Sequence, residues 1–80
     1  MTREDAATHN YDALFADGFD DAIIGVSYRC GSDPVVAYDR EKCIDILAKE
    51  MEYEEAVEYF EFNVIGAYVG ENTPTFITTE

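Results

Sequence analysis

The chain has 80 residues and a formal net charge of −13, from 5 basic and 18 acidic side chains. This charge argues against direct binding to nucleic acid, which needs basic residues to displace counterions, and against attraction to anionic membranes. Hydrophobic residues make up 48% and aromatic residues 14%, which favours one globular domain over residues 1–80 and excludes a disordered chain. Without a membrane-length apolar run or a signal-like start, the sequence predicts a cytoplasmic protein.

The first elements predicted are short and polar. Residues 1–9 are expected to be flexible, and a short helix should follow, capped by Asn10 and ended by Gly18. Its apolar side consists of Tyr11, Leu14 and Phe15. Three acids flank Gly18, namely Asp17, Asp20 and Asp21. They lack the ligand order of a calcium loop, so we expect a solvated acidic loop and no metal site.

A β-hairpin is predicted next. Residues 22–29 alternate as a strand, and the better core face contains Ile24, Val26 and Tyr28. Residues 30–34 form a cluster of turn formers, and residues 35–38 make the second, shorter strand. The two strands should therefore pair with each other.

Two amphipathic helices are then expected. Asp39 is a suitable N-cap for a helix over residues 39–50, whose apolar residues recur at helical spacing. A second, longer helix is predicted over residues 51–70, with Gly70 suited to the left-handed position after it. The link between the helices is short, so they should form an antiparallel αα-hairpin on one side of the sheet.

The long helix carries the strongest pattern in the chain. Seven residues at helical spacing form its predicted buried face, namely Tyr53, Ala56, Val57, Phe60, Val64, Ala67 and Tyr68. An alternative ends the helix near Asn63 and makes residues 64–69 a strand, because several of them suit a strand. Neither face of that strand would be polar, however, so we favour the helix.

A last strand is predicted over residues 75–79, where threonines around Phe76 suit a sheet edge. The fold class is therefore α+β. We expect a small antiparallel sheet, made of the hairpin plus the C-terminal strand and packed on a two-helix hairpin, with a short N-terminal helix.

Three runs resemble a family of small, largely uncharacterised proteins encoded by tailed bacteriophages and prophages. They are DGFDDAIIGV, VVAYDREKCIDIL and YEEAVEYFEFNVIGAYVGENTPTF, the last being the most specific. The resemblance covers residues 17–77 and implies a phage source and the cytoplasm of an infected bacterial cell. It implies no activity and no functional residue.

One candidate site groups Arg29 with Cys30, Asp33 and Asp39. Arg29 is one of few basic residues and lies beside a thiol, whose pKa a nearby cation would lower. The functional interpretation is an arginine that contacts a partner, or a reactive thiol. The competing interpretation, which we favour, is a surface ion pair and an ordinary cysteine.

The second candidate is a row of acids along the long helix. It consists of Glu50, Glu52, Glu54, Glu55, Glu58 and Glu61. Like charges at this spacing cost a helix a few tenths of a kcal/mol each, and no lysine is mixed among them. The row would either bind a basic partner, with Glu54, Glu55, Glu58 and Glu61 as contacts, or serve only as a solvated face, which is the more frequent case.

No catalytic, phosphate-binding or zinc motif occurs, since the sole histidine is His9 near the start. Cys30 and Cys43 are expected to be reduced thiols in a cytoplasmic protein. We therefore expect no cofactor and no enzyme, but an accessory protein that binds a host or phage protein with a basic surface. The alternative is a structural homo-oligomer with exposed Tyr59 and Phe62 at its interface. A small-molecule or catalytic pocket between subunits is the least favoured hypothesis.

Overall fold

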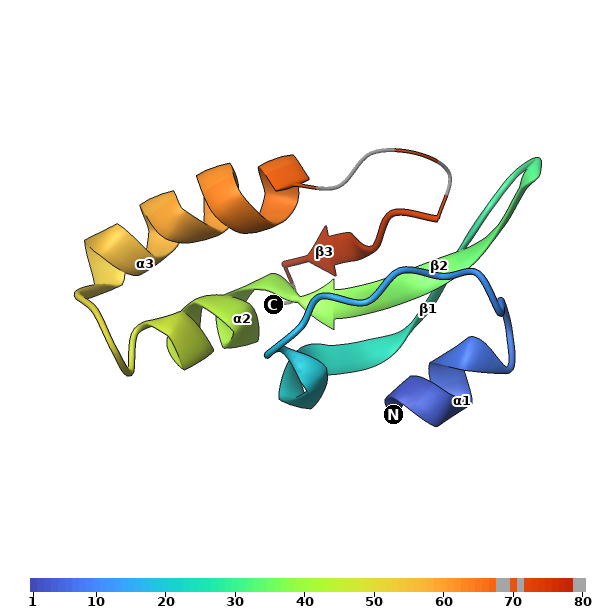
Figure 1. Cartoon of the computed structure of the whole chain (residues 1–80), viewed down its shortest axis with the longest axis horizontal. Coiled ribbons are helices and arrows are strands. Elements are labelled where there is room, and N and C mark those ends of the chain that lie inside the picture. Colours follow the sequence, from blue (N-terminus) through green and yellow to red (C-terminus); the bar gives the residue numbers. More distant parts are fainter. Residues whose placement is uncertain (68–69, 71, 79–80) are drawn as a thin grey trace.

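The computed structural model describes residues 1–67, 70 and 72–78, and it has the α+β architecture predicted from the sequence (Figure 1). Its elements, in chain order, are α1 (Arg3–Ala7), a 3-10 turn (Asp20–Ala22), β1 (Ile23–Arg29), β2 (Ser32–Asp39), α2 (Arg40–Leu47), α3 (Tyr53–Tyr59), a π-helical turn (Phe60–Val64), a second 3-10 turn (Ile65–Ala67) and β3 (Thr75–Ile77). Within these described residues, no helix is long and apolar enough to cross a membrane.

The sheet has the order β1-β2-β3 and is mixed. β1 and β2 form the predicted antiparallel hairpin around a tight turn, where Gly31 adopts a φ of +77° that side chains other than glycine rarely tolerate. β3 lies at the sheet edge as expected, but it runs parallel to β2, so the prediction of an antiparallel sheet is wrong. Thr79, which the predicted last strand includes, lies outside the described residues.

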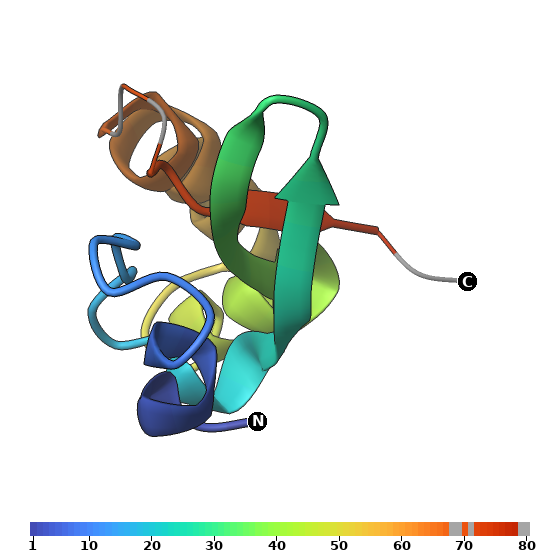
Figure 2. The same cartoon turned by 90° about the vertical axis from the view of Figure 1, so that its right-hand side faces the viewer.

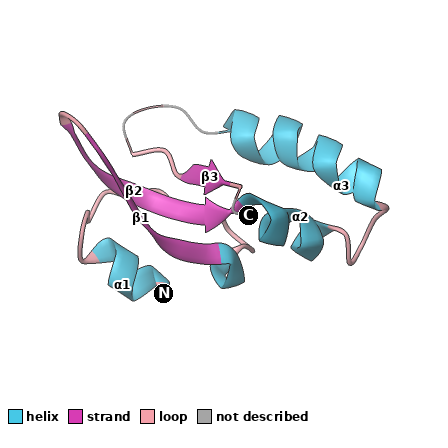
Figure 3. Cartoon of the chain, turned by 180° about the vertical axis from the view of Figure 1, so that it is seen from behind, coloured by secondary structure: helices cyan, strands magenta, loops and turns pink. Residues whose placement is uncertain are grey.

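The direction of β3 follows from the lengths of the two helices. α2 continues beyond the carboxyl end of β2, and α3 returns antiparallel to it (Figures 1 and 3). The eight residues of α2 span about 12 Å, whereas the helical run over residues 53–67 spans about 22 Å. The returning helix therefore carries the chain back past the end of β2. The chain then enters β3 from the opposite end of the sheet and runs in the direction of β2.

The N-terminal helix lies earlier than predicted. Thr2 and Asp5 form a reciprocal capping box at the start of α1, so residues 1–9 include a helix that was not predicted from the sequence. Asn10 does not cap a helix. Its side-chain amide instead donates to the carbonyl of Pro34 (2.8 Å) and to the side-chain oxygen of Asn72 (2.9 Å). It thus ties the N-terminal segment to β2 and to the loop before β3.

The buried face of β1 also differs from the prediction. Ile24 and Tyr28 are 46% and 68% exposed, and Val26 is only partly buried, whereas Ile23 is buried. The pairing of β1 with β2 shifts register between Ile23 and Gly25 and again between Ser27 and Arg29. Register irregularities of this kind interrupt the two-residue alternation of side chains, so the buried face cannot be obtained from a simple alternation in the sequence.

The helical prediction for the long stretch is confirmed as far as Ala67. Ala56, Phe60 and Val64 are buried as predicted, but Tyr53 is 54% exposed, so its predicted place on the buried face is wrong. The regular α-helix begins at Tyr53 and gives way to the π-helical turn at Phe60. The strand alternative is therefore wrong for residues 64–67, while residues 68 and 69 lie outside the described residues. The predicted N-cap of α2 is confirmed, since the carboxylate of Asp39 accepts from the backbone N–H of Lys42 at 3.3 Å.

Three aromatic rings from different segments join the sheet to the helices. Phe76 of β3 stacks on Tyr38 of β2, with centroids 5.4 Å apart, and meets Phe60 edge-to-face at 5.0 Å. The core continues through Cys43 and Ile44 of α2, which are fully buried. Figure 2 shows α3 and the N-terminal segment on the same side of the β1–β2 hairpin, so this core lies between them and the sheet.

Candidate protein-binding surface and adjoining groove

The outer side of α3 and of the π-helical turn carries the predicted acids together with two aromatic rings. We call this surface the acid–aromatic face. It consists of Glu54, Glu55, Glu58, Tyr59, Glu61 and Phe62. All six side chains are exposed, Tyr59 by 45% and Phe62 by 79%, so the predicted exposure of both rings is confirmed. The face lies opposite the buried residues of the same helix, as the helical period requires.

The charge of this face is only partly balanced within the chain. Glu61 forms an ion pair with Arg40 at 3.2 Å, but among the described ion pairs none involves Glu54, Glu55 or Glu58. Glu54 and Glu55 lie in the first turn of α3, where negative charge favours the helix dipole. That local reason does not apply to Glu58, which lies further along the helix. The acids are thus brought together on one side with no lysine among them.

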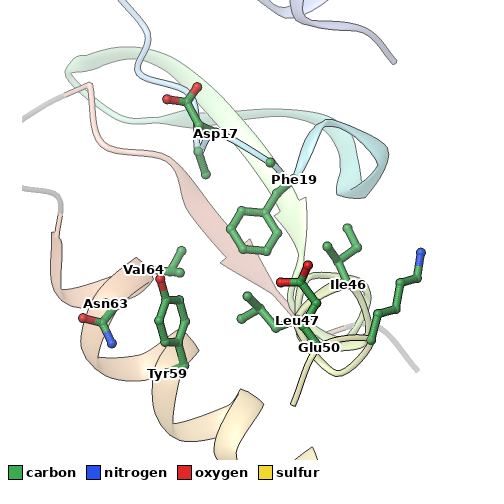
Figure 4. A pocket seen from close by; sticks show the side chains of 11 residues that line it. Asp17, Phe19, Ile46, Leu47, Glu50, Tyr59, Asn63 and Val64 are labelled. Carbon is green, nitrogen blue, oxygen red and sulfur yellow. The ribbon is translucent and has the colours of Figure 1, made fainter.

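A groove borders the acid–aromatic face. It lies between the loop at residues 16–19, the end of α2 with the turn after it, and the helical run after Tyr59 (Figure 4), and its volume is about 510 Å³. Its apolar walls come from Phe19, Ile46, Leu47 and Val64. Its polar lining includes Asp17, Lys49, Glu50, Tyr59 and Asn63. The groove belongs to one chain, so a pocket here does not require the subunit interface considered from the sequence.

The residues grouped around Arg29 do not form one site. Arg29 and Cys30 lie at the hairpin turn, with Asp33 just across it. Asp39 lies at the other end of β2, where it caps α2. It is about 23 Å along the strand from Ser32, the residue that pairs with Arg29. The hairpin turn also lies at the opposite end of the molecule from α3 (Figure 1), so Arg29 is not part of the acid–aromatic face.

Sequence reasoning missed how the chain holds its own arginines. The guanidinium of Arg3 bonds to Asp17 (2.9 Å) and Asp20 (2.7 Å) and lies 5.0 Å from the ring centroid of Phe15. The hydrogen bond to Asp17, and to a lesser extent the one to Asp20, raises the pKa of Arg3 further above its already high ordinary value. The acids predicted as a solvated loop are thus partly neutralised. Among the described residues, no three potential ligands are grouped for a metal ion.

Arg40 is held by the same combination of groups. Its guanidinium bonds to Glu41 (3.1 Å) and Glu61 (3.2 Å) and lies 5.8 Å from the ring centroid of Phe60. An arginine, a pair of carboxylates and an aromatic ring therefore occur together twice in this small fold. The ring contact adds cation–π attraction to each ion pair.

The two cysteines are free and have different surroundings. Cys30 is exposed at the hairpin turn, and Cys43 is buried in the core. Burial, with a smaller effect of Asp39, raises the pKa of the Cys43 thiol to about 12. Because the thiolate is the reactive form, Cys43 should be inert in the folded protein.

We expect Ellman's reagent to modify one thiol per folded chain rapidly and the second only after urea is added. The pH dependence follows from the same burial. In the unfolded chain the thiol ionises near its ordinary pKa of about 9, whereas in the folded chain it ionises near 12. Between these values the unfolded chain binds fewer protons, so the free energy of unfolding should fall as the pH rises from about 9 toward 12.

The control for this pH effect is Cys43→Ala, because lysines and tyrosines titrate in the same range. Urea midpoints at several pH values should fall more steeply for the wild type than for Cys43→Ala. Equal slopes for the two proteins, or rapid labelling of Cys43 in the folded state, would contradict the burial of this thiol.

Comparison of the chain with protein-family models, curated proteins and solved structures gives no match. The resemblance to small phage proteins therefore stays a prediction. Neither a fold relative nor a family member transfers a function to the acid–aromatic face or to the groove.

Proposed function

We propose that this chain is a non-enzymatic phage accessory protein that binds a protein partner with a basic surface through its acid–aromatic face. The observation that carries this proposal is the combination of carboxylates and exposed rings on a single helical surface. Glu55, Glu58 and the neighbouring rings of Tyr59 and Phe62 line one shallow depression. Aromatic residues are enriched at protein interfaces, and complementary charge speeds and orients association.

The net charge of −13 supports a basic protein as the partner rather than nucleic acid or an anionic membrane. A host or phage enzyme that acts on nucleic acid presents such a surface, and an acidic helix placed on it would inhibit or modulate that enzyme. The phage source rests on the resemblance of the run YEEAVEYFEFNVIGAYVGENTPTF. On this proposal the protein acts in the cytoplasm of the infected bacterial cell and needs no cofactor.

A pair of charge-reversal variants tests the proposal. We expect wild-type protein immobilised on a resin to retain a basic protein from bacterial lysate at low salt and to release it at high salt. Glu55→Lys/Glu58→Lys should weaken this retention about tenfold, because two attractions become repulsions. The matched control is Asp12→Lys/Asp45→Lys, which changes two exposed acids outside the acid–aromatic face.

Both double variants raise the net charge of −13 by four units, so bulk charge alone would affect them equally. The expected result is therefore retention by the control and loss in the α3 variant, measured by densitometry over a salt series. Equal loss in both variants, or no retained protein with the wild type, would count against the proposal.

The exposed rings also support a second candidate function, a structural homo-oligomer. Phe62 is 79% exposed, which is unusual for a phenylalanine, and a second copy would cover it. Light scattering at micromolar concentration separates the two functions. A salt-insensitive oligomer that Phe62→Ser dissociates would favour self-assembly, and a monomer would exclude it.

A further inference from the structure

The groove beside α3 is continuous with the acid–aromatic face. Tyr59 and Asn63 line both the groove and the shallow depression that contains Glu55 and Glu58. A side chain projecting from a partner bound on this face would therefore lie next to the groove. Its volume of about 510 Å³ is ample for one large side chain.

The groove combines an apolar floor with polar groups at its rim. Phe19 and Val64 are both 6% exposed and form a fixed floor, with Leu47 partly buried beside them. Figure 4 shows the carboxylate of Glu50 directed toward the ring of Phe19, and Tyr59 also lines the groove. Such a site suits a side chain with an apolar stem and a cationic, hydrogen-bonding end.

The charged groups that line the groove nearly cancel, and the excess negative charge lies at its mouth. The negative charge of Asp17 is already paired with Arg3. The two remaining charges of the lining, on Glu50 and Lys49, are opposite in sign. Glu55 and Glu58 lie beyond Tyr59, in the adjoining depression, and add two further negative charges. Among the described residues that line the groove, Lys49 carries the one positive charge that opposes a cationic side chain.

The chain itself shows which cation this combination of groups holds. Arg3 lies against Phe15 and two carboxylates, and Arg40 lies against Phe60 and two carboxylates. The groove brings one available carboxylate, that of Glu50, together with the rings of Tyr59 and Phe19, and no arginine is among the described residues that line it. A planar guanidinium stacks on an aromatic ring while donating to a carboxylate, which an ammonium group does less well.

We infer that the groove receives one arginine side chain of the partner, with its guanidinium between Tyr59 and Glu50. This inference rests on the proposed function, since it names the partner residue that would anchor to the acid–aromatic face. Anchor residues that fill a pocket at an interface are frequently arginines and account for much of the binding free energy.

A single amino-acid derivative serves as the probe. Nα-acetyl-arginine N-methylamide is titrated into ¹⁵N-labelled protein, and amide shifts report its position and affinity. We expect saturable shifts at Phe19, Glu50 and Tyr59, with a dissociation constant on the order of 1 mM for a ligand of this size. The citrulline derivative has nearly the same shape without the charge, and it should bind at least about fivefold more weakly.

Three exposed positions give variants with opposite expected effects. Glu50→Gln should weaken arginine binding about fivefold, whereas Lys49→Gln should strengthen it about threefold. Asp45→Asn is the matched control, because it also removes one exposed negative charge but lies outside both the groove and the acid–aromatic face. It should change the affinity by less than about twofold.

The pattern of these results decides the inference. Equal binding of the arginine and citrulline derivatives, or equal weakening by Glu50→Gln and Asp45→Asn, would overturn it. Its failure is separable from that of the proposed function. Suppose that the arginine derivative does not bind, while wild-type protein still captures a partner in a salt-sensitive way and Glu55→Lys/Glu58→Lys does not. Only the arginine site would then be rejected. Specific arginine binding without such capture would support the groove and reject the acid–aromatic face as the docking surface.

Discussion

Replacing Phe60 by alanine should destabilise the protein by about 3 to 5 kcal/mol, which is the usual cost of removing a fully buried phenylalanine. The ring is 0% exposed, and it contacts Phe76 edge-to-face at 5.0 Å and lies beneath the guanidinium of Arg40. A domain of this size has a total stability of about 4 to 12 kcal/mol. The variant should therefore lose between about a quarter and all of this stability, and its urea midpoint should fall accordingly.

Phe62→Ala provides the matched control for this prediction. It removes the same side chain two residues further along the same π-helical turn, but Phe62 is 79% exposed. We expect Phe62→Ala to change the free energy of unfolding by less than about 0.5 kcal/mol. Urea unfolding followed by circular dichroism measures both values. Similar losses for the two variants would show that the burial of Phe60 is not what joins the helices to β3.

The helical elements could be predicted because their pattern is local. The spacing of Ala56, Phe60 and Val64 identifies the buried side of the long helix, and Asp39 marks the start of α2. The N-cap and the burial of these three residues hold in the structure, whereas Tyr53, predicted on the same buried face, is exposed at the first position of α3. The direction of β3 could not be obtained in this way, because it depends on how far the returning helix extends past α2. That distance depends on the π-helical and 3-10 turns that extend the helix from Phe60 to Ala67.

The N-terminal helix was missed for a different reason. Its capping box, Thr2 with Asp5, is visible in the sequence, but five residues are too few to show a periodic apolar face. An isolated helix of this length is not stable, because nucleation is unfavourable. The structure attaches it through Arg3 to Asp17 and Asp20, which lie 14 and 17 residues away. Contacts at that separation leave no signal in local patterning.

The acid–aromatic face depends on local sequence pattern, whereas the groove depends on contacts between distant segments. Exposure of Glu54, Glu55, Glu58 and Glu61 follows from the helical period alone, and the structure agrees with it. The groove is built from three segments, at residues 16–19, 46–50 and 59–64, that are far apart in the chain. Only the packing of the N-terminal loop against the helices brings them together. Glu50 belonged to the predicted acid row, but its place at the groove could not be predicted.

One hydrogen bond holds the N-terminal wall of that groove in place. The hydroxyl of Tyr38, a residue that is 0% exposed, accepts from the backbone N–H of Ala16 at 2.8 Å. Ala16 is itself buried and lines the groove. A buried N–H without an acceptor is costly, so this bond links the core of β2 to the position of the loop at residues 16–19.

Tyr38→Phe should therefore lower the free energy of unfolding by about 1 to 3 kcal/mol, since the ring is kept and a buried donor loses its acceptor. Urea unfolding measures the loss, and hydrogen exchange should show reduced protection of the Ala16 amide specifically. Tyr11→Phe is the control, because Tyr11 is 95% exposed and should change stability by less than about 0.5 kcal/mol. Unchanged exchange at Ala16 would refute the role of this bond. If exchange does increase, the arginine derivative should also bind Tyr38→Phe more weakly, because the loop that carries Phe19 would be less ordered.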